Sequence, residues 1–381
     1  RPEREERLRR HLASGRIAVG PWYVLADEFL VGQESLIRNL LMGRLTCARL
    51  GALPMAVGYA PDTFGHVAQL PQILRGFGID SFVFWRGLGD EADRLGAVFH
   101  WRAPDGSHVL AVRMLGSYAA ARDLGRWTSG DGPMLDRPDL WPDAAARRVL
   151  EFLERWGEPI RRSGLRDVLL SSGNDHQPAQ GDLLEMLAAC RARIPRMDFR
   201  VATFEGYVDA LRWRLGEQQE HAGELLGGRE ACVVRGVNST RIYLKQANEA
   251  AERALTLAES LSALAWLRAR TPPTPPSGPS PARGWAPSGR PDYRYPLDEL
   301  RLAWRELLRN HPHDSLPGCS VDEVHLDMQQ RFRSARQIAH HVQREALAAL
   351  AGRVAAPRPW EDPRGEGSLV NVLPWERTRA V

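Results

Sequence analysis

A carboxylate and an imidazole lie close together in residues 59–66, which read Tyr-Ala-Pro-Asp-Thr-Phe-Gly-His. An apolar run precedes this segment and a helical pattern follows it, so Asp62 and His66 come where a predicted strand turns into a helix. Pro61 lacks an N–H and keeps the residue before it extended, which ends the strand. Side chains at this place do the chemistry in α/β folds. Asp62 is therefore a catalytic candidate, and a helix N-cap is its alternative role. For His66 we expect a structural or supporting role.

A second acidic candidate, Asp175, lies in the segment Ser172-Gly-Asn-Asp-His-Gln-Pro178. It follows residues 168–172, an apolar run that we predict to be a buried strand, as an active site at the strand ends requires. A turn residue or a helix N-cap is the alternative, because Gly, Asn and Asp are common in turns. The residues alone leave the two roles of Asp175 open.

Two histidines flank a proline in the segment His311-Pro-His-Asp314. An aspartate after a strand and a distant histidine fit an oxygen and nitrogen site for zinc, so His313 is a candidate metal ligand. The alternative is a connector between two helices whose polar residues cap the helix ends.

Three further residues are candidates for binding a polar substrate. Arg86 ends the predicted strand 81–85, and its five N–H donors suit a carboxylate or a hydroxyl group; its alternative is a surface salt bridge. Asp27, beside Glu28, lies at the mouth of an early strand, where the alternative is a solvated loop. Tyr118 is a pocket candidate.

The blocks Asp62-Thr-Phe-Gly-His66, Gln69-Leu-Pro-Gln-Ile-Leu74 and Phe84-Trp-Arg-Gly87 resemble glycoside hydrolase family 38, the retaining α-mannosidases. Residues 20–30 resemble the preceding strand and loop of the same family. The resemblance implies hydrolysis of terminal α-D-mannosyl residues through a covalent glycosyl-enzyme intermediate, which needs two carboxyl groups.

The family resemblance also assigns roles to the candidates. It makes Asp62 the nucleophile and a zinc ligand, Asp175 the general acid/base and His313 the second zinc ligand. It places Asp314 against sugar hydroxyls, and it places Arg86 beside the nucleophile, where its positive charge favours the ionised carboxylate.

The chain departs from the family pattern at the metal. The family zinc site also uses a His-x-Asp pair on its first strand, within a His-rich motif that contains Trp, and no early strand of this chain carries such a pair. We therefore expect two further zinc ligands upstream of this chain, a barrel that lacks its first strand, and uncertain activity for the chain alone, because two ligands rarely hold zinc tightly.

The predicted fold is α/β with an incomplete (β/α)7-type barrel. Residues 1–235 alternate short apolar runs with amphipathic helices and form the catalytic domain. Residues 236–355 form a three-helix bundle with a Pro-rich insertion at 271–291. Residues 356–381 resemble the first strand of C-terminal β domains. Further strands are expected at 17–20, 55–59 and 199–203, and a hairpin joins 99–101 to 109–112.

The 381 residues carry a net charge of +4 and 26% charged residues, and the arginines are spread along the chain. We infer no nucleic-acid partner and no membrane span. The four cysteines have no metal-finger spacing and favour a reducing, cytoplasmic location. The resemblance implies an α-mannoside substrate and allows a homo-oligomer.

Three other functions are compatible with the sequence. An inactive fragment or pseudoenzyme would keep the fold without the missing zinc ligands. A metal-dependent polysaccharide deacetylase would use Asp and His ligands on a related barrel. The 12 tryptophans would also suit a noncatalytic carbohydrate-binding module.

Overall fold

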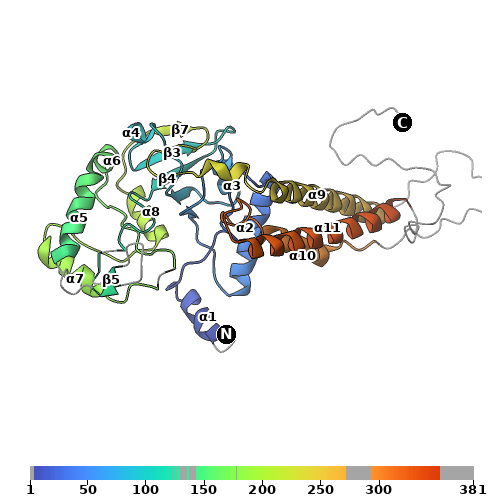
Figure 1. Ribbon diagram of the computed structural model, residues 1–381, viewed down its shortest axis with the longest axis horizontal. Helices are drawn as coiled ribbons and strands as arrows, with labels where there is room; N and C mark the ends of the chain where they lie inside the picture. The colour runs from blue at the N-terminus through green and yellow to red at the C-terminus, as the bar shows by residue number, and fades with distance from the viewer. Residues whose placement is uncertain are drawn as a thin grey trace, which may run out of the picture. The chain divides into compact units, whose positions relative to one another are not determined.

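The computed structural model describes residues 4–122, 124–125, 127–128, 135–136, 143–176, 178–271 and 293–351. Contacts between Cα atoms divide the chain into two compact units, residues 1–238 and residues 239–381. The first unit mixes helices with a sheet and the second contains long helices (Figure 1). The predicted α/β class followed by a helical domain is confirmed.

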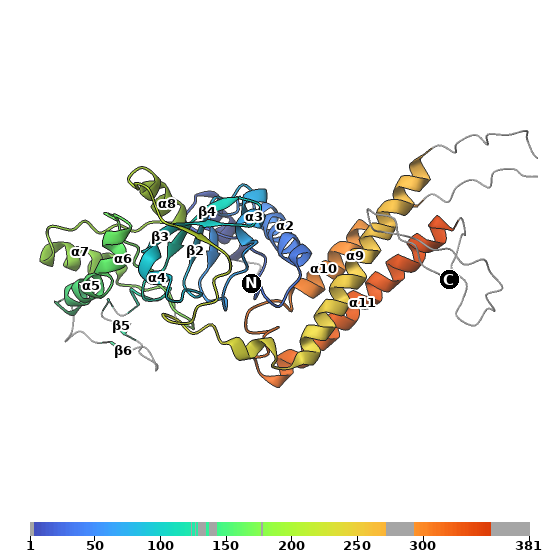
Figure 2. The same ribbon diagram turned by 90° about the horizontal axis from the view of Figure 1, so that it is seen from above.

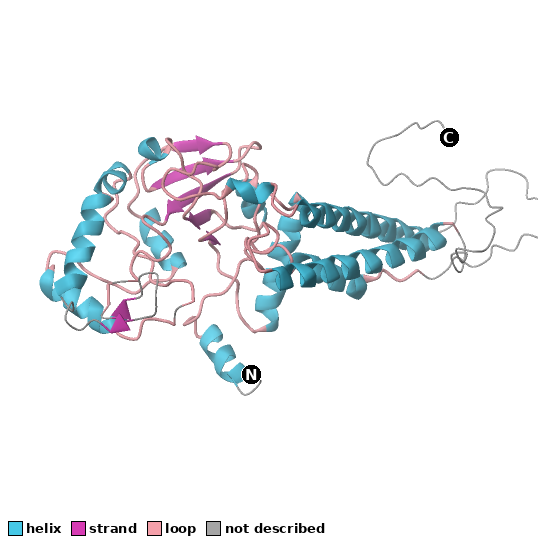
Figure 3. Cartoon of the chain, viewed as in Figure 1, coloured by secondary structure: helices cyan, strands magenta, loops and turns pink. Residues whose placement is uncertain are grey.

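A five-stranded sheet in the order β1-β2-β4-β3-β7 forms the centre of the first unit (Figure 3). Its strands are β1 (Gly58–Ala60), β2 (Ser81–Phe84), β3 (Val98–Arg102), β4 (His108–Arg113) and β7 (Glu220–Ala222). β1, β2 and β4 run parallel to one another, while β3 is antiparallel to β4 and parallel to β7. The hairpin of β3 and β4 confirms the prediction from the turn Pro104-Asp-Gly-Ser107.

The strand β2 is buried at all four positions because both faces of the sheet are covered. Phe82 and Phe84 point into one core with Trp101. Val83 points to the other face and packs with Val112 and Leu211. A strand buried on both faces lacks the alternation of polar and apolar residues, and this explains its continuous apolar sequence.

The helices of the first unit lie around this sheet, and a pair of two-residue strands lies apart from it. The helices are α1 (Glu5–Ala13), α2 (Gln33–Arg49), α3 (Leu70–Gly76), α4 (Ala92–Leu95), α5 (Asp143–Arg155), α6 (Gly157–Arg162), α7 (Leu183–Arg193), α8 (Phe204–Arg212) and the 3₁₀ helix η3 (Arg235–Asn238). β5 (Trp127–Thr128) pairs with β6 (Leu135–Asp136). The amphipathic helices that the sequence predicted within residues 1–235 are confirmed.

The strands predicted at 17–20, 168–172 and 199–203 are wrong, because these segments are irregular in the structure. The apolar residues of 168–172 are divided among three separate cores: Val168 packs in one, Leu169 in another and Leu170 in a third. The apolar run therefore fills gaps between cores and is not part of a ladder. The strand predicted at 55–59 begins only at Gly58.

Three helices form a bundle in the second unit: α9 (Ile242–Arg270), α10 (Leu297–Leu308) and α11 (Asp322–Leu350) (Figure 2). Small residues on α9 and α11 are completely buried, for example Ala251, Ala258, Ala335 and Ala339, and they allow close helix approach. The predicted helices are confirmed. Residues 272–291 of the predicted Pro-rich insertion and the predicted β segment 356–381 lie outside the described residues.

No helix within the described ranges is long and apolar enough to cross a membrane.

The helix α2 is fixed to the segment before it by a close backbone approach at Gly43. The amide of Asn39 accepts from Tyr23 N at 2.7 Å and donates to Val24 O at 2.8 Å. A Cβ on Gly43 would lie 2.1 Å from Pro21 O. Glycine is needed here because the backbone of the neighbouring segment occupies the place of a side chain.

We predict that Gly43→Ala destabilises the protein by about 1–3 kcal/mol, because the added methyl group clashes with backbone. Helix propensity alone would stabilise the alanine variant by about 1 kcal/mol. The sign of the change in the free energy of unfolding therefore tells the clash from the propensity effect. Gly76→Ala, where a Cβ meets nothing within 4 Å, is the control. Denaturant unfolding of both variants measures the difference, and a stabilised Gly43→Ala variant would contradict the packing.

Candidate active site

Asp62 and Arg86 each lie two residues after the end of a strand, Asp62 after β1 and Arg86 after β2. The two strands are parallel neighbours whose last residues are register partners. Arg86 therefore reaches Asp62: its Nε donates to Oδ1 at 2.6 Å, and its Nη2 lies 2.6 Å from the same oxygen. The side chains of Asp62 and Arg86 are only 20% and 15% exposed, which strengthens the attraction between them.

The guanidinium group of Arg86 has partners on every side. Its Cζ lies 4.2 Å from the ring centre of Trp85 and 5.8 Å from that of Phe64. Its Nη1 donates to the backbone carbonyl of Cys232. The sequence left Arg86 either a binding role or a surface salt bridge. The surface salt bridge is excluded, because two aromatic rings shield the guanidinium group and it donates to both Asp62 and the carbonyl of Cys232.

Tyr118 and Asp175 form the second polar pair of the site. The hydroxyl group of Tyr118 donates to Asp175 Oδ2 at 2.9 Å. The ring of Tyr118 meets that of Trp85 edge to face, with 5.2 Å between ring centres. Trp85 thus contacts both Arg86 and Tyr118, and it connects the pair Asp62–Arg86 to the pair Tyr118–Asp175.

Both carboxylates raise the pKa of the same two tyrosines, Tyr59 and Tyr118. Burial and the negative charges of Asp175 and Asp62 raise the pKa of Tyr59 to about 12. Burial, the hydrogen bond to Asp175 and the charges of both carboxylates raise the pKa of Tyr118 as well, and Arg86 opposes this rise. Asp62 and Asp175 are far apart in sequence, yet both are close enough to Tyr59 and Tyr118 to raise the pKa of each. The two tyrosines therefore stay protonated near neutral pH and can donate hydrogen bonds.

Asp27, Glu28 and His66 lie beneath the surface. Asp27 is 1% exposed and accepts from Phe29 N at 3.1 Å. Glu28 binds Nδ1 of His66 at 2.7 Å and accepts from Val67 N at 2.9 Å. The alternative of a solvated loop is wrong for both acids, and the sugar contact of Asp27 stays a prediction. His66 packs edge-on against Phe82 and Phe84, which fits the structural role expected for it.

His313 and Asp314 lie in the second unit, in the connection between α10 and α11. Nε2 of His313 is 3.8 Å from Asp314 Oδ2, and their side chains are 16% and 67% exposed. The neighbouring His311 is completely buried and donates from Nε2 to Asn248 Oδ1 at 2.8 Å. Burial lowers the pKa of His311 to about 3, so this ring is neutral and supports the connection as a structural residue.

The donors within the described residues do not make a complete zinc site by themselves. No group of three or more His, Cys, Asp or Glu side chains in this part of the chain is placed to hold a metal ion. Protein zinc sites use three or four such ligands. Asp62 and His313 remain candidate ligands, each within its own unit.

Sequence reasoning missed two contributors to the site. Tyr59 is the middle residue of β1. The available signal was an aromatic residue three positions before the catalytic candidate Asp62. The carbonyl of Cys232 has no such signal, because every residue carries a carbonyl group.

Two carboxyl groups that share one region are typical of glycoside hydrolases. Residues 1–224 match the glycosyl hydrolases family 38 N-terminal domain, and residues 233–350 match the alpha mannosidase middle domain. The chain belongs to glycoside hydrolase family 38, as the sequence motifs indicated.

Individual relatives agree with this family. The chain is 30% identical, over 87% of its length, to a protein of Halalkalibacterium halodurans named "Putative mannosylglycerate hydrolase". It is 26% identical, over its whole length, to mouse "Alpha-mannosidase 2C1". Among solved structures, an alpha-mannosidase from Enterococcus faecalis V583 superposes with a TM-score of 0.75 at 30% identity over 92% of the chain. The chain spans 34%, 32% and 36% of these three proteins, about a third of their length.

The raised pKa of Tyr59 predicts a loss of stability at alkaline pH. Unfolded tyrosine ionises near pH 10, so between about pH 10 and 12 the unfolded chain has lost a proton that the folded chain keeps. The free energy of unfolding therefore falls as pH rises, by at most about 1.4 kcal/mol per pH unit for one proton. Tyr59→Phe removes this contribution and flattens the slope, as urea unfolding at several pH values measures.

Asp175→Asn tests whether the carboxylate and the phenol share a region. Removing its charge lowers the pKa of Tyr59 toward the ordinary value, so the slope becomes flatter than in the unsubstituted chain. Glu185→Gln, an exposed acid on α7, is the control and leaves the slope as it was. Equal slopes in all three proteins would place Asp175 away from Tyr59.

Proposed function

We propose that the complete protein containing this chain hydrolyses terminal α-D-mannosyl residues with retention of configuration, and that residues 1–238 supply both catalytic carboxyl groups. The observation that carries the proposal is the continuous chain of contacts from Asp62 through Arg86, Trp85 and Tyr118 to Asp175. Membership of family 38 and relatives named as alpha-mannosidases support the substrate class.

In the first step, a carboxylate oxygen of Asp62 attacks the anomeric carbon and forms a glycosyl ester, while the bond to the leaving oxygen breaks. Arg86 fixes the carboxylate by binding Oδ1. A positioned nucleophile reduces the entropy lost on reaching the transition state, so the ion pair contributes orientation as well as charge.

Asp175 in its protonated form gives its proton to the leaving oxygen as that bond breaks. In the second step the Asp175 carboxylate takes a proton from a water molecule, and this water releases the sugar from Asp62. The hydroxyl group of Tyr118 binds Oδ2 of Asp175 and holds the carboxyl group in one orientation through both steps.

Zinc is part of the proposal for the complete protein only. Asp62 and His313 would be two ligands, with two others from the family's first-strand His-x-Asp pair, which no early strand of this chain carries. When bound, the ion would hold the nucleophile and adjacent sugar hydroxyls, and Asp314 would bind hydroxyls beside it. No reaction step above depends on the metal.

The proposal also covers the leaving group of the substrate, the cellular location and the oligomeric state. Since one relative is named as a mannosylglycerate hydrolase, the substrates to test include a mannoside with an anionic leaving group besides mannosyl oligosaccharides. A cytoplasmic location of the complete protein is also part of the proposal. The resemblance allows a homo-oligomer, and sedimentation of the complete protein measures its oligomeric state. No comparison favours a deacetylase or a carbohydrate-binding module.

We predict that Asp62→Asn in the complete protein lowers kcat on an aryl α-mannoside by at least about 10³-fold, because the carboxylate proposed to form the ester is lost. Asp175→Ala lowers kcat by roughly 10²–10⁴-fold on mannosides with poor leaving groups and far less on activated aryl mannosides, which need no proton. Steady-state kinetics on both substrate types measures the contrast.

Asp209→Asn, an exposed acid on α8, is the matched control and keeps full activity. Equal losses on both substrate types would refute the acid role of Asp175, and retained activity in Asp62→Asn would refute the nucleophile. Complete inactivity of the unsubstituted protein with metal bound would indicate a pseudoenzyme. Release of acetate from an acetylated glycan would indicate a deacetylase.

We predict that His313→Ala lowers the zinc content of the purified complete protein, since an imidazole ligand is lost. Elemental analysis gives the ratio of zinc to protein. His341→Ala, an exposed histidine on α11, is the control and keeps the ratio of the unsubstituted protein. An unchanged ratio in His313→Ala would remove this residue from the ligand set.

A further inference from the structure

Residues 225–232, which we call the strap, bind the backbone of the two segments that follow β1 and β2. Leu225 exchanges two hydrogen bonds of 2.9 Å with His66, four residues beyond Asp62. Gly227 N donates to Gly87 O at 2.8 Å, one residue beyond Arg86. The strap therefore connects the segment that carries Asp62 to the segment that carries Arg86.

The strap packs on these segments at backbone distance. A Cβ on Gly65 would lie 2.8 Å from Leu225 O, and one on Gly87 would lie 2.7 Å from the same oxygen. A Cβ on Gly227 would lie 1.9 Å from Gly89 N. Gly65 and Gly87 also have φ values of +104° and +114°, which favour glycine. The contact leaves little room for the strap to shift.

The end of the strap reaches the catalytic pair itself. The backbone carbonyl of Cys232 accepts from Nη1 of Arg86, while Nε of the same guanidinium group donates to Asp62. The position of this carbonyl therefore helps to set the direction in which Arg86 presents its other donors. A displaced strap would move Arg86, and Arg86 would move Asp62.

A buried ion pair, the inner clamp, holds the strap in place. Nη2 of Arg113, at the end of β4, donates to both carboxylate oxygens of Glu230. Nη1 of Arg113 also donates to the carbonyl of Gly96. The side chains of Arg113 and Glu230 are 3% and 25% exposed. Loss of one partner would leave a poorly solvated charge in the protein.

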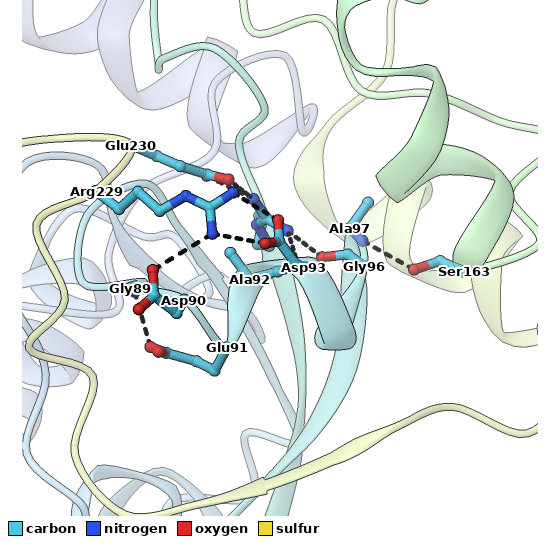
Figure 4. Close-up of polar contacts among 11 residues, drawn as sticks. Gly89, Asp90, Glu91, Ala92, Asp93, Gly96, Ala97, Ser163, Arg229 and Glu230 are labelled. Atoms are coloured by element: carbon cyan, nitrogen blue, oxygen red, sulfur yellow. Dashed lines mark hydrogen bonds and ion pairs between the residues drawn. The ribbon is translucent and has the colours of Figure 1, made fainter.

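An exposed ion pair, the outer clamp, holds the neighbouring strap residue. Arg229 donates to both oxygens of Asp93, at 2.6 and 2.7 Å, and lies 3.5 Å from Asp90 (Figure 4). The side chains of Arg229 and Asp93 are 44% and 70% exposed. An exposed pair of this kind contributes little to stability, so its removal leaves the fold intact.

We propose that Glu230 and Arg113 are positioning residues for the Asp62–Arg86 pair, acting through the strap and the carbonyl of Cys232. Neither side chain is proposed to touch the substrate. The inner clamp fixes residue 230, the backbone carries this constraint two residues on to Cys232, and Arg86 transfers it to the nucleophile. A misplacement of about 1 Å at a reacting group can cost about 10²-fold in rate. The kinetic consequence rests on the proposed function.

The first test follows the Nε–H group of Arg86 by NMR in the 381-residue chain. Arg86→Lys identifies the signal by removing it, and Asp62→Asn shows where it moves when its acceptor is changed. In Glu230→Gln, which keeps the shape of the side chain but removes its charge, we expect the signal to shift or broaden. Glu220→Gln is the matched control, because Glu220 forms an exposed pair with Arg102 in the same sheet; it leaves the signal in place.

The second test measures kinetics in the complete protein. Glu230→Gln should lower kcat about ten- to hundredfold with KM within about twofold, because the nucleophile is displaced while the sugar contacts remain. Glu220→Gln should match the unsubstituted protein. Asp93→Asn, which opens only the outer clamp, should shift the Arg86 signal less than Glu230→Gln and lower kcat about two- to fivefold.

An unchanged Arg86 signal in folded Glu230→Gln would overturn the inference. If circular dichroism shows that Glu230→Gln does not fold, Arg113→Lys decides, because it keeps the charge but loses the two-pronged contact with Glu230, and an unchanged signal there overturns the inference equally. An unsubstituted complete protein that hydrolyses no mannoside would refute the proposed function, whereas the NMR result would still decide whether the clamp positions Arg86.

Discussion

The ion pair of Arg86 and Asp62 is the interaction on which the rest of the site depends. Its guanidinium group binds a carboxylate on one side and the carbonyl of Cys232 on another, while the ring of Trp85 lies 4.2 Å away. These groups come from two neighbouring strand ends and from a segment about 146 residues farther along the chain. One planar cation thus fixes three backbone segments at once, because its donors point in fixed directions. A lysine at position 86 could not do this.

The parts of the site that follow from local sequence were predictable. Pro61 ends β1 and the aromatic run 81–85 forms β2, so parallel pairing brings the residues after both strands together. The pairing of Asp62 with Arg86 follows from this geometry and from the family motif. The β3–β4 hairpin and the three long helices of the second unit were equally clear, since turn residues and helical periodicity are local signals.

The rest depended on contacts between distant residues. Residues 168–172 are as apolar as a buried strand, yet three cores share their side chains and no ladder forms. Asp175 follows this irregular segment, and it is placed by the hydroxyl group of Tyr118 instead of by a strand end. The buried pair of Glu28 and His66 joins residues 38 positions apart, and neither residue type indicates its partner. A backbone carbonyl such as that of Cys232 carries no sequence signal at all.

The two carboxyl groups and their supports all belong to the α/β unit, whereas His313 and Asp314 belong to the helical unit. The segment around His313 is held inside its own unit, because buried, neutral His311 binds Asn248 on α9 and Lys245 binds Pro317 O at 2.9 Å. Each unit therefore fixes its own candidate residues by its own packing. Under the proposed function, the two carboxyl groups that would break the bond at the anomeric carbon belong to the first unit, and the proposed contacts of His313 to metal and of Asp314 to sugar hydroxyls belong to the second. Substitutions in the strap should then change kcat, while substitutions around His311 should change metal content and sugar affinity.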